Sequence, residues 1–241
     1  MALAVEDIRS RYMRSFLGVG WVFVSFALFV GVKVAIFLPL SNGDVSFFGP
    51  YVALGFFAWT YVSSAIVDGC AVFIGAANWI KGSRTPKTVF ILQSVIRNLF
   101  LTAVNFAVVA VVLALSGVHL TPMALLAIPI FGLFILNAIW IHMFFGAIGA
   151  RYRDFVHLVQ TIMRVMFFLT PVFWLPEQMG RLMDILIFNP LTHYIFLFRD
   201  PIIYGTVPMT SLWVVLGVTV VGSALALAVF AYSRRKIVFW L

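Results

Sequence analysis

The chain has 241 residues, of which 63% are hydrophobic and only 10% are charged. A soluble globular domain is usually about 45–50% apolar and about 25% charged, so this composition excludes that class and indicates a membrane protein. The formal net charge is +8, but the basic residues are scattered over short loops, which argues against nucleic-acid binding. No polar stretch is long enough to fold alone, so one transmembrane domain over residues 1–241 is predicted.

Residues 1–16 are predicted to form an amphipathic helix in the membrane interface. At about 100° per residue, its apolar side chains fall within an arc of about 80°, and polar and basic side chains lie opposite. The arginines would then lie beside anionic lipid headgroups. The alternative is a disordered basic tail. The first apolar block is too long for the core of a signal peptide, so no cleavable signal is expected.

Six long apolar blocks follow this segment, each of about 19 to 28 residues. Since about 20 helical residues cross a hydrocarbon core of about 30 Å, the sequence predicts an all-α polytopic membrane protein with six transmembrane helices. The blocks are residues 21–40, 48–74, 88–115, 122–148, 156–174 and 211–231.

Basic residues set the orientation of these spans. Short loops rich in Lys and Arg stay in the cytoplasm, so both termini are predicted to be cytoplasmic. On the other side we place only Arg181 and Arg199. The cytoplasmic set is Arg9, Arg11, Arg14, Lys81, Arg84, Lys87, Arg151, Arg153, Arg234, Arg235 and Lys236.

The inner loop over residues 75–87 reads GAANWIKGSRTPK. It predicts one short helix from about Ala77 to Lys81, broken by Gly82 and stopped by Pro86. The end of this loop looks briefly like a nucleotide-binding loop, but it lacks the second Gly before Lys87 and no strand precedes it. A nucleotide site in this chain is therefore not expected.

Residues 176–208 contain two apolar runs, residues 182–188 and 194–198, that are too short to span. Asn189 and Pro190 separate the runs, and Asp200-Pro201 is expected to end the second. Runs of this length are typical of re-entrant or interfacial helices. A spanning run would also move Arg234 and its basic neighbours outside, against the charge rule. We predict two short re-entrant helices in the outer half of the bilayer, between spans five and six.

Several charged residues fall inside the predicted spans. Lys33 lies about 18 Å deep at about 1.5 Å per residue, where a charge costs about 2.5–3.5 kcal/mol unless it meets a cavity or a partner. Lys33 is a pathway residue, a structural ion pair with Asp68, or a side chain that reaches the surface. Arg97 and Arg164 indicate either a buried polar network or a water-accessible path.

Aromatic side chains recur at helical spacing on two of the spans. Thr170-Pro171 should kink or unwind the fifth span. Such faces either stack on sugar rings or serve for lipid contact and packing. The two stripes are Phe26, Phe29, Lys33 and Phe37 on the first span, and Gln160, Phe167, Pro171 and Trp174 on the fifth.

The sequence lacks the residue patterns of enzymes and metal sites. Cys70 is the single cysteine, which excludes an intrachain disulfide, and the four His are scattered. No metal-binding pair, no nucleophile motif and no paired membrane carboxylates are present. No catalytic residue, metal or cofactor is therefore predicted in the chain.

Four strings together resemble the permeases of type-2 ABC exporters, in the branch that exports O-antigen and related lipid-linked polysaccharides. The resemblance covers nearly the whole chain, and the order of the strings is more specific than any one of them. Ala77 and Asn78 stand where an acidic residue is frequent in that family. The strings are RSRYMRSFLGVGW (9–21), YVALGFFAWTYVSSAIVDGCAVFIGAANWIKGSR (51–84), GARYRDFVHLVQTIMRVMFFLTPVFW (149–174) and FNPLTHYIFLFR (188–199).

The resemblance implies a homodimer in the bacterial inner membrane that pairs with two copies of a cytoplasmic ATPase, which would hold ATP and Mg. It implies a lipid-linked glycan as substrate, an ATPase-coupling helix within residues 75–87, and an outer gate over residues 176–208. For coupling we predict Asn78, Trp79, Ile80, Lys81 and Arg84, with Trp79 and Ile80 as apolar anchors. The gate residues would be Asn189, Pro190 and Arg199, and the two aromatic stripes with Arg164 would line a path between protomers.

Other interpretations keep the membrane architecture but change the activity. An exporter of another cargo, such as a teichoic-acid-like polymer, a drug or a lipid, is the first alternative. Secondary transporters usually show inverted repeats and several buried acidic residues, and we find neither. An intramembrane enzyme would need a nucleophile–base or metal constellation, which is also missing from the sequence.

Overall fold

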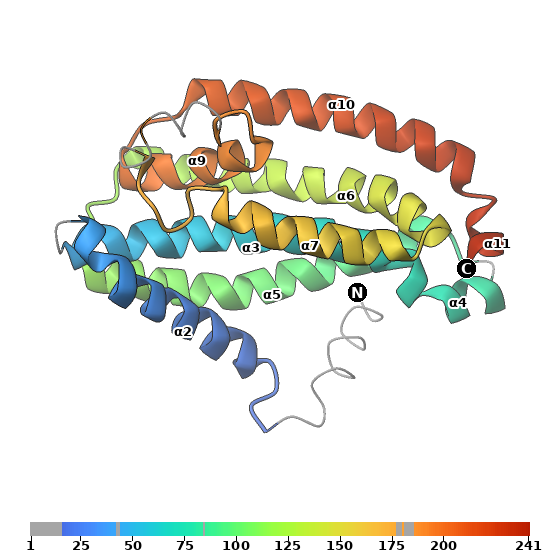
Figure 1. The fold of residues 1–241 in the computed structure, drawn as a ribbon, viewed down its shortest axis with the longest axis horizontal. Helices are drawn as coiled ribbons and strands as arrows, with labels where there is room; N and C mark the ends of the chain where they lie inside the picture. Colours follow the sequence, from blue (N-terminus) through green and yellow to red (C-terminus); the bar gives the residue numbers. More distant parts are fainter. Residues whose placement is uncertain (1–15, 42–43, 84, 177–179, 181–185) are drawn as a thin grey trace.

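The computed structural model describes residues 16–41, 44–83, 85–176, 180 and 186–241. Over these residues the regular elements are helices, as the predicted all-α class requires. The predicted amphipathic helix lies, except for its last residue, outside the described residues. Figure 1 shows a bundle of long helices: α3 (Val45–Gly75), α5 (Lys87–Ser116), α6 (Ala127–Arg151) and α10 (Met209–Ser233) run along its long axis.

Five helical segments of the described chain are long and apolar enough to cross a membrane. They contain α2 (Gly20–Phe37), α3 with the short helix α4 (Ala77–Gly82), α5, α6 and α10. Their outward side chains are mostly apolar, as lipid contact requires; Leu28 on α2 and Val220 on α10 are 65% and 69% exposed. The protein is therefore a multi-pass α-helical membrane protein.

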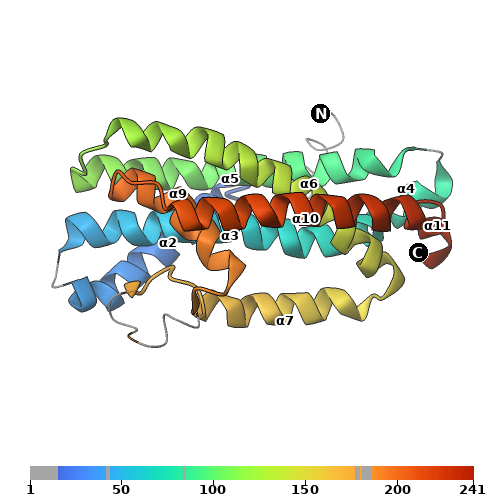
Figure 2. The ribbon, with the colours of Figure 1, turned by 90° about the horizontal axis from the view of Figure 1, so that it is seen from above.

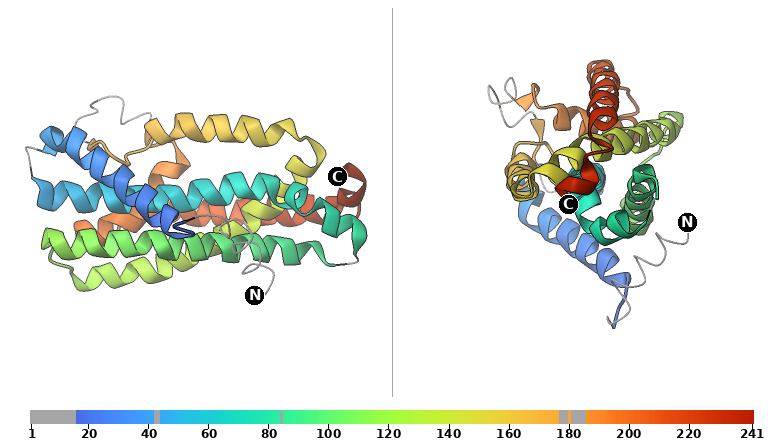
Figure 3. Two further views of the ribbon diagram at one scale, coloured as in Figure 1. Left: turned by 90° about the horizontal axis from the view of Figure 1, so that it is seen from below. Right: turned by 90° about the vertical axis from the view of Figure 1, so that its right-hand side faces the viewer.

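Helix α3 lies at the centre of the bundle. Its first turn is capped by Asp44, whose carboxylate accepts hydrogen bonds from the backbone N–H groups of Ser46 (2.9 Å) and Phe47 (3.2 Å). Around it pack α2, α5, α6, α7 (Asp154–Phe168) and α9 (Pro190–Ile203). In the end-on view of Figure 3, α2 and α7 lie next to each other, and the view from above in Figure 2 shows α10 in front of the bundle, where it packs on α6 and α9.

Glycines allow α3 and α6 to approach closely. A Cβ atom on Gly149 would lie 2.0 Å from the Cys70 carbonyl oxygen, and one on Gly146 would lie 2.7 Å from a methyl group of Val72. Small residues at such crossings let backbones meet, which is a common way for membrane helices to pack. The close crossing buries Cys70 completely.

The predicted fifth span forms a shorter helix than the sequence indicated. Helix α7 ends at Phe168 after 15 residues, about 22 Å at about 1.5 Å per residue, and residues 169–174 continue as turns and bends. Pro171 explains the break, because it lacks an N–H and disfavours the helical conformation of Thr170. The expected local unwinding is therefore confirmed, and the continuous span through Trp174 is not formed.

Short helices occupy the two ends of the bundle. Helix α4 and helix α11 (Ile237–Trp240) lie at one end, and α9 lies toward the other (Figure 1). Short 3-10 turns over Leu38–Ser41 and Pro122–Leu126 complete the connections. The bounds of α4 confirm the short helix predicted from Ala77 to Lys81.

Helix α9 corrects one predicted boundary. The second apolar run does not end at Asp200-Pro201, because the helix continues through Pro201 to Ile203. A proline inside a helix costs about 3 kcal/mol. Each fully buried large apolar side chain returns about 1.5–3 kcal/mol, and α9 buries several of them against α3 and α10, so packing outweighs the proline. These are Ile195, Leu197, Phe198 and Ile202. Most of the first run, residues 182–188, lies outside the described residues.

Candidate functional site

A groove of about 510 Å³ runs between α2, α3 and α7, on the side of the bundle where α2 and α7 are neighbours. Its walls are mainly aromatic, and its polar edge comes from α7 and from Ser63 of α3. Lining residues are Phe29, Phe56, Trp59, Ser63, Val67, Gln160, Met163, Arg164, Phe167 and Phe168.

The aromatic walls of this groove form one connected cluster. Phe29 of α2 stacks on Phe56 of α3, with ring centroids 3.8 Å apart. Phe167 of α7 meets the edge of Phe29 at 5.7 Å and of Trp59 at 5.5 Å. Edge-to-face and offset-stacked pairs at 4.5–7 Å are each worth about 0.5–1.5 kcal/mol beyond burial. These ring contacts join α2 and α7 to α3.

Lys33 lies at one end of this cluster and carries the positive charge of α2. Its ammonium is 4.6 Å from the ring centroid of Phe173, 5.4 Å from Phe29 and 5.3 Å from Phe37. Cation–π contacts of this length are worth about 0.5–2 kcal/mol, more when water is excluded. The ion pair with Asp68 is not formed, because Asp68 pairs with Arg97.

The predicted path residues separate into two groups. Phe29, Gln160, Arg164 and Phe167 line the groove together, and Lys33 and Phe37 join them through Phe173. The other three predicted residues are buried inside the protein and do not line the groove: Phe26, Pro171 and Trp174.

Side chains hold the irregular segment that follows α7. The orphan carbonyl groups at the helix end each accept a hydrogen bond: Phe167 from the Thr170 hydroxyl (3.1 Å), and Phe168 from the Trp174 indole (3.2 Å). Leu169 accepts one from the Asn189 amide (3.3 Å). Irregular backbone at membrane depth needs such partners, since lipid offers none.

Arg199 is the main support of this segment from α9. It is only 1% exposed, it donates to the Pro171 carbonyl oxygen at 2.7 Å, and its guanidinium lies 3.8 Å from the ring centroid of Tyr51. Tyr51 in turn donates to the Trp174 carbonyl oxygen at 3.0 Å. Arg199 is therefore a buried residue that ties α9 to the end of α7, and its place on the outer side of the membrane stays a prediction.

The other two predicted gate residues begin α9. The Asn189 side chain accepts a hydrogen bond from the Leu191 N–H at 3.0 Å, and Pro190 takes the first helical position. This is the residue order that starts a helix with its free N–H groups satisfied. Asn189 therefore contacts both α9 and the segment after α7.

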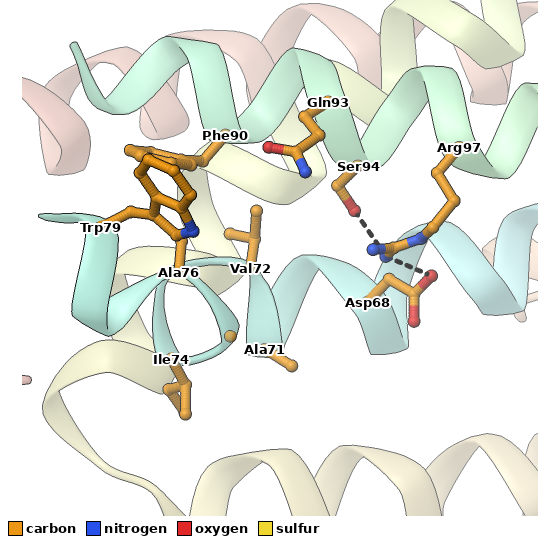
Figure 4. Close-up of a pocket in the computed structure, with 11 residues that line it drawn as sticks. Asp68, Ala71, Val72, Ile74, Ala76, Trp79, Phe90, Gln93, Ser94 and Arg97 are labelled. Carbon is orange, nitrogen blue, oxygen red and sulfur yellow. Dashed lines mark hydrogen bonds and ion pairs between the residues drawn. The ribbon is translucent and has the colours of Figure 1, made fainter. Parts of the chain in front are cut away.

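A second pocket, of about 410 Å³, lies where α3 ends, α4 follows and α5 begins (Figure 4). At its deeper end, Arg97 donates to the carboxylate of Asp68 and to the hydroxyl of Ser94, both at 3.1 Å. Trp79 and Phe90 lie at the other end. The two charged residues in this part of the predicted spans thus form a structural pair that also faces a pocket.

The predicted coupling residues differ in exposure. Asn78, Trp79 and Lys81 are exposed on α4, and Trp79 is 64% exposed. Ile80 is 3% exposed and packs in the core. It is therefore wrong as a surface anchor, because the short helix turns its side chain toward the bundle. Arg84 lies outside the described residues.

Sequence inspection missed the partners that complete these sites. Phe56 and Trp59 lie on α3 outside the two predicted stripes, and Phe173 lies beyond the end of α7. Ser94 and His142 come from different helices, and their hydrogen bond of 3.0 Å joins α5 to α6. Buried polar residues inside an apolar span were the only available signal.

Among the described residues, no three His, Cys, Asp or Glu side chains gather as metal ligands would.

Comparison with known proteins identifies relatives. No family model matches the chain. Two proteins from Klebsiella pneumoniae and one from Myxococcus xanthus are similar to it, each named O-antigen export system permease protein RfbA. One Klebsiella relative is 23% identical over 203 residues, 83% of this chain and 78% of the relative. The Myxococcus relative is 23% identical over 178 residues, 72% and 67%. The predicted resemblance to O-antigen export permeases is thus confirmed.

Proposed function

We propose that this chain, a relative of O-antigen export permeases, is the transmembrane subunit of an ATP-driven ABC exporter. Its cargo would be a lipid-linked polysaccharide of the O-antigen type, moved across the inner membrane of a bacterium. The observation that carries the proposal is the similarity to the three permeases, which extends over most of their length and most of this chain. The chain itself would supply the passage, and ATP and Mg would be held by the separate ATPase.

The proposed topology has six spans with both termini in the cytoplasm. Helix α7 and the irregular segment 169–174 together would form the fifth span. Hydrogen bonds to the carbonyl oxygens of Leu169, Pro171 and Trp174 support this placement, because they allow non-helical backbone at membrane depth. Residues 176–208, with α9, would then form an outer gate of short helices, with Asn189, Pro190 and Arg199 at its base.

The passage would lie between two copies of the chain. A polymer needs a continuous opening, and two protomers facing each other through α2 and α7 could separate without breaking either core. The aromatic groove between these helices supports the proposal. Its rings could stack on the C–H faces of sugars, while Gln160 and Arg164 at its edge would hydrogen-bond to hydroxyl groups.

Helix α4 would be the coupling helix, through which ATP hydrolysis by the partner subunit acts on the permease. It lies at the same end of the bundle as the start of α5, the end of α6 and the end of α10, where Lys87, Arg151 and Arg234 are found (Figure 1). Asn78, Trp79 and Lys81 present exposed side chains there. Two copies of a cytoplasmic ATPase would contact the two α4 helices of the dimer.

The test is export in cells. Inactivating the gene should abolish polysaccharide at the cell surface and leave lipid-linked glycan inside, as measured with a glycan-specific antibody on intact and permeabilised cells. The wild-type gene should restore export only together with an active ATPase, and an ATPase with a mutated nucleotide site serves as the control. Surface glycan that persists in the null strain would exclude this role.

A further inference from the structure

The pocket between α3, α4 and α5 has the size and the walls of a small-ligand site, although none of the predicted path residues lines it. Its volume of about 410 Å³ falls within the range of about 300–1,000 Å³ for such sites. Figure 4 shows an ion pair at one end, Trp79 and Phe90 at the other, and Gln93 between them. The two ends therefore offer different kinds of contact.

The polar end is held in place by a chain of hydrogen bonds with a fixed direction. A carbonyl oxygen can only accept, so the Nδ1–H of His142 donates to Ala138 at 2.7 Å, which leaves Nε2 as the acceptor for the Ser94 hydroxyl at 3.0 Å. The Ser94 oxygen then accepts from Arg97, whose same nitrogen donates to Asp68. His142 and Ser94 are almost completely buried. Arg97 is thus positioned before any ligand arrives.

The charges of this end favour an uncharged ligand. Arg97 and Asp68 neutralise each other, and their side chains remain 14% and 36% exposed. An anion would meet the more exposed carboxylate, and a cation would meet the guanidinium. A ligand with several hydroxyl groups can donate to Asp68 and accept from Arg97, and the amide of Gln93 can do both.

The opposite end offers a flat apolar surface. Trp79 extends from α4 beside Phe90 of α5, and the Trp79 side chain is 64% exposed (Figure 4). A ring that has hydroxyl groups at its edge and C–H groups on its face would satisfy both ends at once. Among biological ligands this combination is typical of a sugar ring, whose C–H face packs on aromatic side chains.

We infer that this pocket binds one uncharged sugar unit of the glycan at the cytoplasmic end of the permease. The identity of the glycan as source rests on the proposed function, whereas the binding chemistry rests on the pocket alone. Because Trp79 belongs to α4, the bound unit would contact the same helix that we propose to face the ATPase. Binding of a sugar unit in the pocket would therefore signal to α4, the proposed coupling helix, that cargo is present.

Binding can be measured on the full chain in lipid nanodiscs without its ATPase. Saturation-transfer difference NMR with the methyl glycosides of glucose, galactose, mannose and rhamnose should detect at least one binder. Trp79→Ala should weaken that binding about two- to tenfold, and Gln93→Ala by a similar factor. Trp213→Ala, which removes another exposed tryptophan at 71% exposure on α10, is the matched control and should change nothing.

The outcomes separate this inference from the proposed function. Failure of all four glycosides to bind, binding that survives Trp79→Ala with Gln93→Ala, or displacement of the glycoside by inorganic phosphate would each overturn the sugar site. Size-exclusion profiles and thermal melting establish that each variant is folded. If the wild-type complex exports glycan without glycoside binding, only the site fails. If glycosides bind and variants respond as expected but no glycan is exported, the site stands and the proposed function fails.

Discussion

At the scale of single residues, two glycines decide how closely α3 and α6 meet. The ideal Cβ position on Gly149 coincides with the carbonyl of Cys70, a backbone group that a rotamer change cannot move. The next turn repeats the contact at Gly146, against Val72. Since α3 is the central helix, a shift at this crossing would be transmitted to the helices that pack on it.

Gly149→Ala should therefore destabilise the protein by about 1–3 kcal/mol, the usual cost of overpacking. Gly132→Ala, in the same helix but with nothing within 4 Å of its Cβ, is the matched control and should be neutral or slightly stabilising. Reversible unfolding in detergent–SDS mixtures measures both. Equal stability of the two variants would contradict the close crossing.

Lys33 is a second residue whose surroundings make a sharp prediction. Lys33→Met keeps the length of the side chain but removes a charge that costs about 2.5–3.5 kcal/mol to insert, which offsets the loss of three cation–π contacts worth about 0.5–1 kcal/mol each at a partly exposed site. The amount of folded protein in the membrane should not fall. Export per molecule should fall several-fold if Lys33 lies on the passage, and Lys33→Arg should retain most of it. Surface glycan normalised to permease level is the measurement, and full export by Lys33→Met would argue against the path.

At the scale of elements, α9 depends on Asn189, the residue that caps its start. Asn189→Ala removes both the cap and the hydrogen bond to Leu169, so it should cost about 1 kcal/mol or more. Asn189→Asp keeps the acceptor for the cap and loses only the donor, and should retain most of the stability. Unfolding midpoints of the two variants test this order. Equal destabilisation by the two variants would show that the contact with the end of α7, which both variants lose, matters more than the cap.

Helix α4 is the element on which coupling is proposed to depend. Lys81→Glu reverses an exposed charge on α4, away from the residues that line the neighbouring pocket. It should reduce the ATPase activity that the permease elicits from its partner several-fold, without lowering permease levels. Arg235→Glu, an exposed charge reversal next to α10, is the control and should have a smaller effect. A larger loss of ATPase activity with Arg235→Glu than with Lys81→Glu would place the ATPase contact at the end of α10 rather than on α4.

At the scale of the whole molecule, the described chain contains five helices of spanning length and the shorter α7. With α7 as a sixth crossing, both termini face the cytoplasm, and with five crossings they face opposite sides. Alkaline phosphatase fused at Ser116 should be active outside, and a fluorescent protein fused at Leu241 should fluoresce inside. Phosphatase activity at Leu241 would show that α7 does not cross the membrane.

The sequence by itself determined the architecture of long helices, because a helix that crosses the bilayer needs about 20 consecutive apolar residues. Apolar length defined the five long helices, Gly82 marked the end of α4, Pro86 preceded α5, and Thr170-Pro171 marked the break after α7. These features depend on residues that are close in the chain. The resemblance to export permeases also came from the sequence alone, through the order of four short strings.

Only the tertiary structure decided which polar and aromatic residues meet. An ion pair with Asp68 was one of the alternatives for Lys33, but Asp68 meets Arg97, because α3 packs against α5. Arg199 was predicted at the outer gate, but its hydrogen bond to the segment after α7 follows only from the burial of α9. Helical periodicity gives the face of a residue but not the helix it faces, and that choice depends on how the whole bundle packs.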